Sequence, residues 1–285
     1  MIFYFVKKLF HFLARKGFRH FERLFGLHVT PAHYYSPIPI TSDLKPDDFE
    51  KISEGVGIDW NETQQLGFLK TTCSRRAAEF VPQRNSGLSL ADAYILHTML
   101  REKAPRLMVE IGAGDTTKIS LNALDLNRRE GKPFKFHSIE PYPRPDLLRI
   151  SDPDFELTPL KVQEVDIELI SSADLLFIDS SHVSKIGSDV NFEILEIVPR
   201  MKVGSVIHWH DIVLPANYWK EWIEDGNMFW NESYMVHSFM LFNESFRILW
   251  ASRFMSLKHI TEMKTVFPYL RDEHRLTSFW VERVK

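Results

Sequence analysis

Short apolar runs alternate with helical patterns over most of the chain after residue 105. Each run is a few residues long and ends in polar or turn-forming residues, which is typical of buried strands. The runs that predict strands cover residues 107–111, 134–140, 155–162, 174–179, 205–211, 246–251 and 278–284. Helical periodicity predicts helices at 116–129, 184–201 and 230–244. Such alternation favours an α/β fold, in which a mostly parallel sheet carries helices on both faces and ligands bind at the carboxyl ends of the strands.

The first part of the chain has a different pattern. Residues 28–48 contain four prolines and little periodicity, so we expect an extended arm there. Helices follow at 59–73, with Asp59 as the expected N-cap, and at 89–103, with Ser89 in that position. We therefore predict two parts: residues 1–88 with a helix, an arm and a helical cap, and residues 89–285 with the sheet.

Residues 1–26 predict a basic amphipathic helix, because aromatic and aliphatic residues alternate with Lys and Arg and no acid precedes Glu22. Such a helix can lie on an anionic membrane surface or dock on a partner. Alternatively, it packs on its own domain or on a second subunit of a homo-oligomer. A cleaved secretory signal is not expected, because Lys7 and Lys8 interrupt the apolar run.

Composition narrows the classes further. The 285 residues include 35 basic and 38 acidic side chains, for a net charge of −3, which gives no reason to expect a nucleic-acid partner. Cys73 is the single cysteine, so no internal disulfide can form. No stretch reaches the ~18 apolar residues of a membrane span. We expect a cytoplasmic protein, with the inner membrane surface as the alternative location for its N-terminal helix.

The motif VEIGAGDTT places Glu110, Gly112 and Gly114 between a predicted strand and a predicted helix. Glycines let the backbone pass close to a ligand, and the following helix presents free N–H groups, although a tight strand–helix turn needs glycines anyway. Glu140 follows at the end of the next strand, where an acid can accept hydrogen bonds from both ribose hydroxyls. Thr117 occupies the position of the third glycine of the nicotinamide dinucleotide fingerprint, which argues against that cofactor.

Residues 175–215 join two strands that each end in an acid, Asp179 and Asp211, through one helix. Here the sequence resembles the bacterial class I methyltransferases whose fourth strand ends IDGxH and whose fifth strand ends in Asp. That group includes macrolide-sugar O-methyltransferases and proteins named as cephalosporin hydroxylases. The segment YYSPIPITSDL resembles the N-terminal arm of one of its branches. The resemblance implies a Rossmann-like, mostly parallel seven-stranded methyltransferase sheet with helices on both faces, preceded by an N-terminal helical extension.

The resemblance also implies roles for particular residues. Glu110, Gly112 and Gly114 would contact the methionine end of S-adenosylmethionine, and Glu140 would hold its ribose. Asp166 would lie near the adenine edge, with a helix N-cap as the equally weighted alternative. Asp179 and Asp211 match positions that hold a divalent metal (Mg, Mn or Fe) in metal-dependent O-methyltransferases.

The sequence departs from the group at Thr116, at Gly204 and at Ile212. The last departure removes a hard oxygen ligand after Asp211 and so weakens a magnesium assignment.

Three histidines lie near the two strand ends: His182, His208 and His210. With Asp179 or Asp211 they could form a site suited to iron, zinc or manganese. Alternatively, His182 or His210 takes the proton of the acceptor as a general base, or the histidines are structural. The expected catalytic residues are His182, His210 and Asp211, and the expected metal ligands are Asp179, His208, His210 and Asp211.

The function expected from these observations is methyl transfer from S-adenosylmethionine to an oxygen of a sugar-like or small hydroxylated acceptor. Aromatic residues in the 212–233 loop would contact this small-molecule or glycan acceptor together with the N-terminal arm. Two alternatives remain open: an iron-dependent oxygenase on the same fold, and a non-catalytic binding protein attached to membranes.

Overall fold

A computed structural model describes residues 2–82, 87–267, 270–271 and 275–285. The chain divides into two compact units. Residues 1–50 and 219–229 form the smaller unit, and residues 51–218 and 230–285 form the larger one, which contains the sheet. The boundary expected at residue 88 lies inside the larger unit, which begins at residue 51.

The larger unit contains a seven-stranded sheet of order β3-β2-β1-β4-β5-β7-β6. The strands are β1 (Leu107–Ile111), β2 (Lys135–Ile139), β3 (Phe155–Thr158), β4 (Leu175–Ile178), β5 (Val206–Trp209), β6 (Phe246–Ala251) and β7 (Phe279–Arg283). The first five pair in parallel, and β7 is antiparallel to both of its neighbours. All seven strands were predicted, and the Rossmann-like methyltransferase topology is confirmed. The final two strands pair antiparallel at the edge of the sheet, where β7 lies between β5 and β6.

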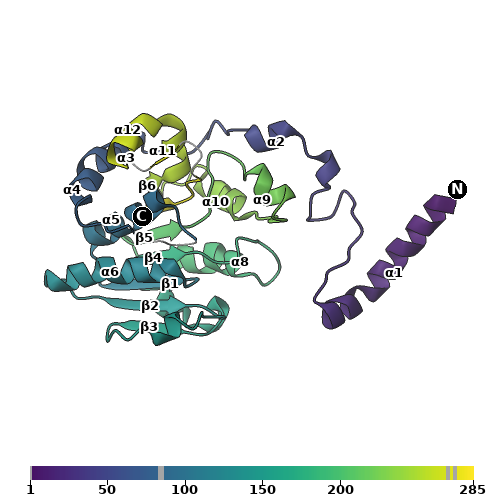
Figure 1. Ribbon diagram of the computed structural model, residues 1–285, viewed down its shortest axis with the longest axis horizontal. Helices are drawn as coiled ribbons and strands as arrows, with labels where there is room; N and C mark the ends of the chain where they lie inside the picture. Colours follow the sequence, from purple (N-terminus) through teal and green to yellow (C-terminus); the bar gives the residue numbers. More distant parts are fainter. Residues whose placement is uncertain (1, 83–86, 268–269, 272–274) are drawn as a thin grey trace. The chain divides into compact units, whose positions relative to one another are not determined.

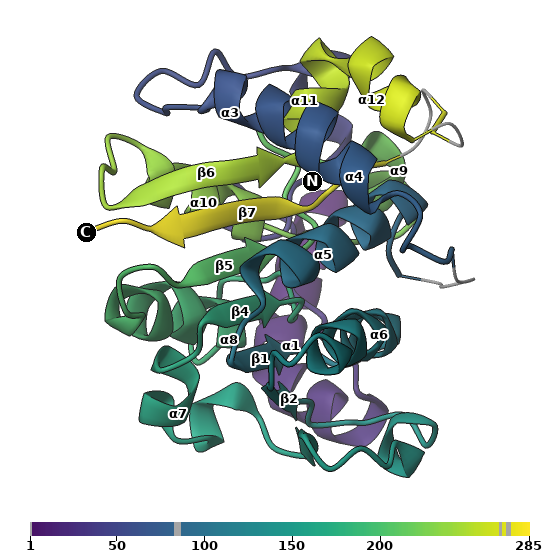
Figure 2. The ribbon, with the colours of Figure 1, turned by 90° about the vertical axis from the view of Figure 1, so that its left-hand side faces the viewer.

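Helices cover both faces of this sheet. In Figure 2, α5 and α6 lie in front of the strands, and α8 and α10 lie behind them. The helices of the larger unit are α3 (Glu62–Gly67), α4 (Ser74–Arg76), α5 (Leu90–Lys103), α6 (Asp115–Arg129), α7 (Ile167–Ser171), α8 (Asp189–Phe192), α10 (Glu232–Met240), α11 (Ser252–Lys258) and α12 (Ile260–Val266). Because it is covered on both sides, β4 is buried at every position. Burial of each such Leu or Ile contributes about 1.5–3 kcal/mol relative to an exposed position.

Helix ends follow the expected chemistry in part. Ser89 caps α5 by accepting a hydrogen bond from the Asp92 N–H, as predicted. Asp59 does not cap the helix predicted at 59–73. Asn61 is the N-cap of α3, and Asp59 accepts a hydrogen bond from the Asn61 N–H. The helix expected at 184–201 begins with α8 at Asp189, because Ser188 provides the cap there. The polar segment between β6 and β7 forms α11 and α12, which were not predicted.

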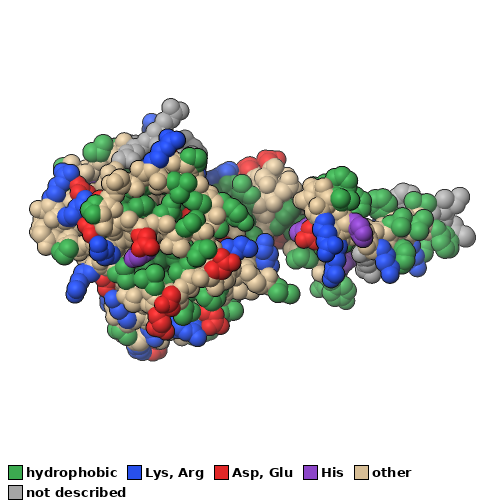
Figure 3. Space-filling view, turned by 90° about the horizontal axis from the view of Figure 1, so that it is seen from below, with side chains coloured by type: hydrophobic (Ala, Val, Ile, Leu, Met, Phe, Trp, Pro, Cys, Tyr) green, Lys and Arg blue, Asp and Glu red, His purple; other side chains and the backbone are tan. Residues whose placement is uncertain are grey.

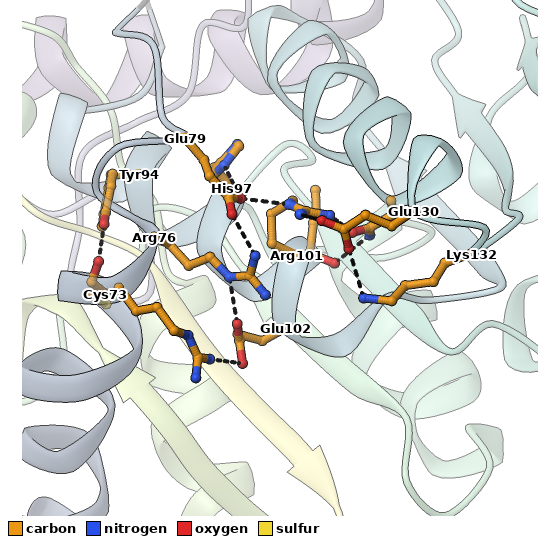
Figure 4. Close-up of polar contacts among 12 residues, drawn as sticks. Cys73, Arg76, Glu79, Tyr94, His97, Arg101, Glu102, Glu130 and Lys132 are labelled. Atoms are coloured by element: carbon orange, nitrogen blue, oxygen red, sulfur yellow. Dashed lines mark hydrogen bonds and ion pairs between the residues drawn. The ribbon is translucent and has the colours of Figure 1, made fainter.

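A buried ion network joins the helices on the front face (Figure 4). The guanidinium of Arg101, in α5, is 2% exposed; it donates to Glu79 (2.8 Å) and pairs with Glu130, after α6. Arg76 in α4 donates to both Glu79 and Glu102 at 2.7 Å. A buried guanidinium is tolerated when it is paired, and Arg101 has two carboxylates and the Asn127 side chain as partners.

The smaller unit contains α1 (Ile2–Phe25), α2 (Pro46–Glu50) and α9 (Lys220–Glu224), seen in Figure 1. The predicted N-terminal helix is present. Of the arm expected at 28–48, residues 28–40 form no regular helix or strand, but a 3-10 helix at Thr41–Asp43 and the start of α2 occupy the rest. Among the described helices, none combines the length and apolar character needed to cross a membrane.

Candidate active site

The carboxyl ends of three neighbouring strands meet at one edge of the sheet. Backbone pairing continues one residue beyond each strand, since Asp179 N donates to Ile111 O (2.8 Å) and His210 N donates to Ile178 O (2.9 Å). Parallel strands lie about 4.8 Å apart, so side chains that follow their ends share a small volume. This register places Gly112, Asp179 and His210 side by side.

Four side chains converge there: Asp179, His182, His210 and Asp211, whose potential ligand atoms all lie within 4.8 Å of one another. We call this group the acid–histidine cluster. The Nε2 atom of His182 lies 3.3 Å from Asp179 Oδ1 and 3.4 Å from Asp211 Oδ2. The Nδ1 atom of His210 lies at the same two distances from the same two oxygens. One nitrogen of each imidazole and one oxygen of each carboxylate therefore face a common centre.

Backbone strain positions two members of the cluster. His182 has φ 59° and Asp211 has φ 53°, in the left-handed region that residues with a Cβ rarely adopt. The His182 carbonyl accepts hydrogen bonds from the N–H groups of Asn231 (3.1 Å) and Glu232 (3.2 Å), which hold this turn at the start of α10. Strain of this kind costs on the order of 1–3 kcal/mol per residue and persists where the surroundings enforce it.

Glu232 is a fifth group of the site, and the sequence analysis missed it. Its carboxylate lies 2.8 Å from His182 Nδ1, and the residue is 1% exposed. It thereby fixes which imidazole nitrogen faces the cluster centre. An acid in the first turn of a helix is ordinarily explained by the helix dipole, so the sequence carried no distinguishing signal.

Negative charge dominates this buried volume. Burial raises the pKa of Asp179, but the positive charges of His210 and His182 outweigh this effect and hold the pKa well below its usual range. Burial lowers the pKa of His182, but its contacts with Asp179 and Glu232 outweigh this and raise the pKa to about 10. Burial also lowers the pKa of His210, but the charges of Asp211 and Asp179 outweigh this effect and raise the pKa well above its ordinary value. The carboxylates thus favour positive charge at the cluster centre.

The donor set fits a divalent metal ion. Neighbouring ligand atoms around one ion, with bonds of about 2.1 Å, are separated by about 3.0 Å at right-angle coordination and about 3.4 Å at tetrahedral coordination. The four nitrogen–oxygen distances of 3.3–3.4 Å fall in this range. The contact of Glu232 with His182 Nδ1 is also typical of metal-ligating histidines, which donate their second ring N–H to a carboxylate.

His208 is placed differently from the other two histidines. It is fully buried between the rings of Phe177 (4.1 Å between centroids) and Trp280 (4.4 Å), and its Nε2 lies 3.2 Å from the Ser278 hydroxyl. Burial lowers its pKa well below the ordinary value, which keeps the ring neutral. Its nitrogens are not among the atoms that converge in the acid–histidine cluster. The structure therefore does not bring His208 together with the other expected metal ligands.

A cavity of about 430 Å³ opens beside the cluster, at the carboxyl ends of β1, β2 and β4. Gly112, Glu140 and Asp179 are among the residues that line it. The carboxylate of Glu140 accepts hydrogen bonds from the backbone N–H of Tyr142 (2.7 Å) and of Ala113 (3.3 Å), which fix its position at the cavity wall. Asp179 belongs to both the cavity and the cluster, so the two volumes share a wall.

The two glycines of the first motif are needed for different reasons. A Cβ at Gly112 would lie 1.8 Å from the Asp179 carbonyl oxygen, and φ is +87°. Close packing of β1 against β4 therefore requires this glycine even without a ligand. A Cβ at Gly114 would meet no atom within 4 Å, so the protein itself leaves that space open.

Glu110 lies beneath the turn and not at the cavity wall. It is fully buried, and its oxygens accept hydrogen bonds from the hydroxyls of Thr116 (2.7 Å), Thr117 (2.6 Å) and Ser138 (2.7 Å). Burial raises the pKa of Glu110 to about 7. Its position supports the turn and the start of α6, and it explains why threonines follow the glycines in this chain.

Asp166 is exposed and caps α7 by accepting a hydrogen bond from Glu168 N (3.0 Å), as the N-cap alternative predicted. It does not line the cavity. That part of the wall is formed by Lys161, Val162 and Gln163, which follow β3 after two intervening residues and were not predicted as site residues.

Comparison with known proteins agrees with this topology. Residues 109–212, which span β1 to the residue after Asp211, match the family model of a methyltransferase domain. This confirms the resemblance to class I methyltransferases; the narrower group of sugar O-methyltransferases is not distinguished by it. No curated protein matches the chain.

Solved structures with the same fold include three methyltransferases of low sequence identity. The O-methyltransferase TomG from Streptomyces achromogenes, involved in tomaymycin synthesis and solved with SAM, is 12% identical over 78% of this chain and 90% of its own, with a TM-score of 0.48. The SAH-bound methyltransferase PaMTH1 from Podospora anserina is 10% identical over 78% and 88%, with a TM-score of 0.44. An O-methyltransferase from Bacillus cereus, in complex with SAH, is 13% identical over 77% and 91%, with a TM-score of 0.41.

Proposed function

We propose that this chain transfers the methyl group of S-adenosylmethionine to a hydroxyl oxygen of a small, sugar-like acceptor, beside a divalent metal held by the acid–histidine cluster. The observation that carries the proposal is the position of Asp179, which lines the cavity and also belongs to the cluster. A donor in the cavity and an acceptor at the cluster would then be neighbours. Methyl transfer is an in-line displacement from a sulfonium, so this proximity supplies much of the catalysis.

The donor's adenosine fits the cavity wall that contains Glu140. A carboxylate at the end of the second strand of such a sheet can accept hydrogen bonds from both ribose hydroxyls. The free space at Gly114 and the first turn of α6 leave room for the methionine end. Glu110 holds the turn from below through Thr116 and Thr117 and keeps these backbone N–H groups in place.

The acceptor side of the site is formed by the cluster itself. Asp179, His182, His210 and Asp211 would hold the ion, and Glu232 would orient His182 toward it. A bound divalent ion supplies Lewis-acid chemistry, which lowers the pKa of a coordinated acceptor hydroxyl. Without an ion, His210 lies where it could take the hydroxyl proton only after losing its own, because the charges of Asp211 and Asp179 raise its pKa. Trp230 packs on His182 with 4.5 Å between ring centroids, and such an aromatic face suits a sugar ring.

Cofactor binding is tested by titrating the full-length protein with S-adenosylhomocysteine in a calorimeter. Glu140→Gln removes the charged acceptor at the ribose and should weaken binding by about 1–3 kcal/mol, or roughly 5- to 150-fold. Glu156→Gln in β3 is the matched control, because its carboxylate is 66% exposed and does not line the cavity. Equal affinities of both variants and the unchanged protein would refute the placement of the ribose.

Methyl transfer is tested with labelled S-adenosylmethionine and a panel of methyl glycosides and catechol as probe acceptors. Asp211→Asn should abolish turnover while the affinity for S-adenosylhomocysteine stays within about threefold, since Asp211 contacts the cluster and does not line the cavity. Loss of activity with a chelator and its return with added Mn²⁺ would support the metal. Activity that resists chelators but disappears in His210→Gln would support the metal-free base.

The donor set also favours a second candidate function, an iron-dependent oxygenase. Two histidines with carboxylates and open positions are the ligands of many non-haem Fe²⁺ enzymes. Oxygen consumption by the iron-loaded protein, together with methyl transfer that fails even with every probe acceptor, would favour this reaction. Methyl transfer under anaerobic conditions would instead support the methyltransferase over the oxygenase.

A further inference from the structure

Within the smaller unit, the N-terminal helix α1 keeps an apolar face exposed. Five apolar side chains of α1 recur at spacings of three, four or eight residues, which places them on one side of the helix. They are Val6, Phe10, Leu13, Phe21 and Leu24. Their exposed fractions are 57%, 66%, 55%, 40% and 72%, respectively. An exposed apolar surface of this size on a folded protein marks an interaction site. We call these five residues the apolar face of α1.

Basic residues gather on the opposite side of the same helix, with the exposed Phe5 and Phe12 among them. Lys8, Lys16, Arg19 and Arg23 are all exposed and share that side by their spacing. No acid occurs before Glu22, so nothing earlier in the helix neutralises them. Long basic side chains beside an apolar face can reach lipid head groups while their stems stay in the apolar layer. The charge of α1 is therefore complementary to an anionic surface, and its apolar face needs an apolar partner.

The chain after α1 adds a basic hollow on this unit. Gly26 turns the backbone with φ +62°, and Phe18 stacks on His28 with 5.2 Å between ring centroids. A shallow cleft results beside Lys16 and Arg19. Its lining contains no acid and consists of Lys16, Phe18, Arg19, Val29, Thr30 and Pro31. Two cations around a half-apolar cleft suit a phosphate group attached to an acyl chain. In Figure 3, apolar and basic side chains cover the right-hand end, where α1 lies.

We propose that α1 binds flat on an anionic lipid bilayer, with the apolar face at the boundary of the acyl chains and the basic residues at the lipid phosphates. A helix with these two faces lies in the interface and does not span the membrane. The proposal is independent of the reaction of the larger unit. If both hold, the enzyme works at a membrane surface on acceptors that are present there.

The experiment is cosedimentation of the full-length protein with vesicles of two compositions. We expect binding to vesicles of phosphatidylglycerol mixed with phosphatidylcholine, and binding at least about tenfold weaker to phosphatidylcholine alone. The double variant Phe10→Ser/Leu13→Ser should lose at least about tenfold in affinity for the anionic vesicles, because it removes much of the buried apolar surface. Lys8→Gln/Arg19→Gln should lose roughly twentyfold on the same vesicles and little on the neutral ones.

Leu148→Ser is the matched control. Leu148 is 62% exposed and lies outside α1, so its loss should change vesicle affinity by less than about twofold. The unfolding midpoint and circular dichroism of each variant report whether the chain still folds. The proposal would be overturned if the unchanged protein did not sediment with anionic vesicles. It would also be overturned if Phe10→Ser/Leu13→Ser bound these vesicles as tightly as the unchanged protein does. Self-association that disappears in Phe10→Ser/Leu13→Ser, without vesicle binding, would identify the face as a contact between two copies and also overturn it.

Discussion

Replacement of Gly112 by alanine tests the link between the cofactor turn and the acid–histidine cluster. The added Cβ would lie 1.8 Å from the Asp179 carbonyl oxygen and 2.7 Å from the Asp179 carbonyl carbon. Both atoms are backbone, so they cannot move away as the end of a flexible side chain can. The backbone also has φ +87°, where alanine is strained by about 1–2 kcal/mol. Overpacking adds about 1–3 kcal/mol.

We therefore expect Gly112→Ala to lower the free energy of unfolding by about 2–5 kcal/mol, which corresponds to a fall in Tm of roughly 5–15 °C for a domain of this size. Urea unfolding followed by circular dichroism measures this loss as a lower midpoint with an unchanged slope. If Gly112→Ala had the same urea midpoint as the unchanged protein, the reasoning would be refuted, because the turn would then have relaxed away from β4 at little cost.

Gly114→Ala is the matched control for the same experiment. Its Cβ enters open space and its φ of −164° is extended backbone that any residue adopts, so stability should change by less than about 0.5 kcal/mol. Calorimetry with S-adenosylhomocysteine should nevertheless show weaker binding, by about tenfold, if the methyl group occupies space meant for the methionine end. Unchanged affinity in this variant would place the cofactor elsewhere.

Three further predictions concern single side chains. Glu232→Gln should lower Mn²⁺ affinity, measured by calorimetry, by about 10- to 100-fold; an unchanged affinity would remove Glu232 from the metal site. Burial, with nearby Arg101 and Arg76, lowers the pKa of His97 to about 4 despite the opposing charge of Glu79. The folded protein therefore keeps His97 neutral. Its contribution to stability is complete above about pH 6.5 and is lost as the pH falls toward 4. His97→Gln should therefore flatten the dependence of the urea midpoint on pH between about 4 and 6.5. Ser89→Ala should cost about 1 kcal/mol in the same urea assay, because α5 loses its N-cap; a change below about 0.3 kcal/mol would contradict the cap.

The sheet was predictable because its strands are short apolar runs with clear ends. Runs such as 174–179 and 205–211 carry the burial of a covered parallel strand in their composition, and each was found within one or two residues. The order of β6 and β7 was not predictable, since only tertiary packing decides which of two final strands pairs with β5. The helices α11 and α12 were missed because each is only seven residues long, too short to show a clear helical period.

The cluster was largely predictable for the same reason. Asp179, His210 and Asp211 directly follow strands, so strand register alone brings them together. His208 could not be distinguished from His210 by alternation along the strand, because the difference is whether the ring lies within the core or beyond the strand end. Glu232 comes from a helix 50 residues after His182, and only the folded chain shows that contact.

The shared position of Asp179 makes the donor cavity and the acid–histidine cluster one thermodynamic system. Its carbonyl oxygen packs against Gly112, and its carboxylate faces the two imidazoles, so a shift of this residue alters both volumes at once. When a cofactor and a metal ion both bind, each must change the affinity for the other by the same factor. If the proposed cofactor and metal both bind, a change at this single residue at the end of β4 would therefore alter the affinity for each.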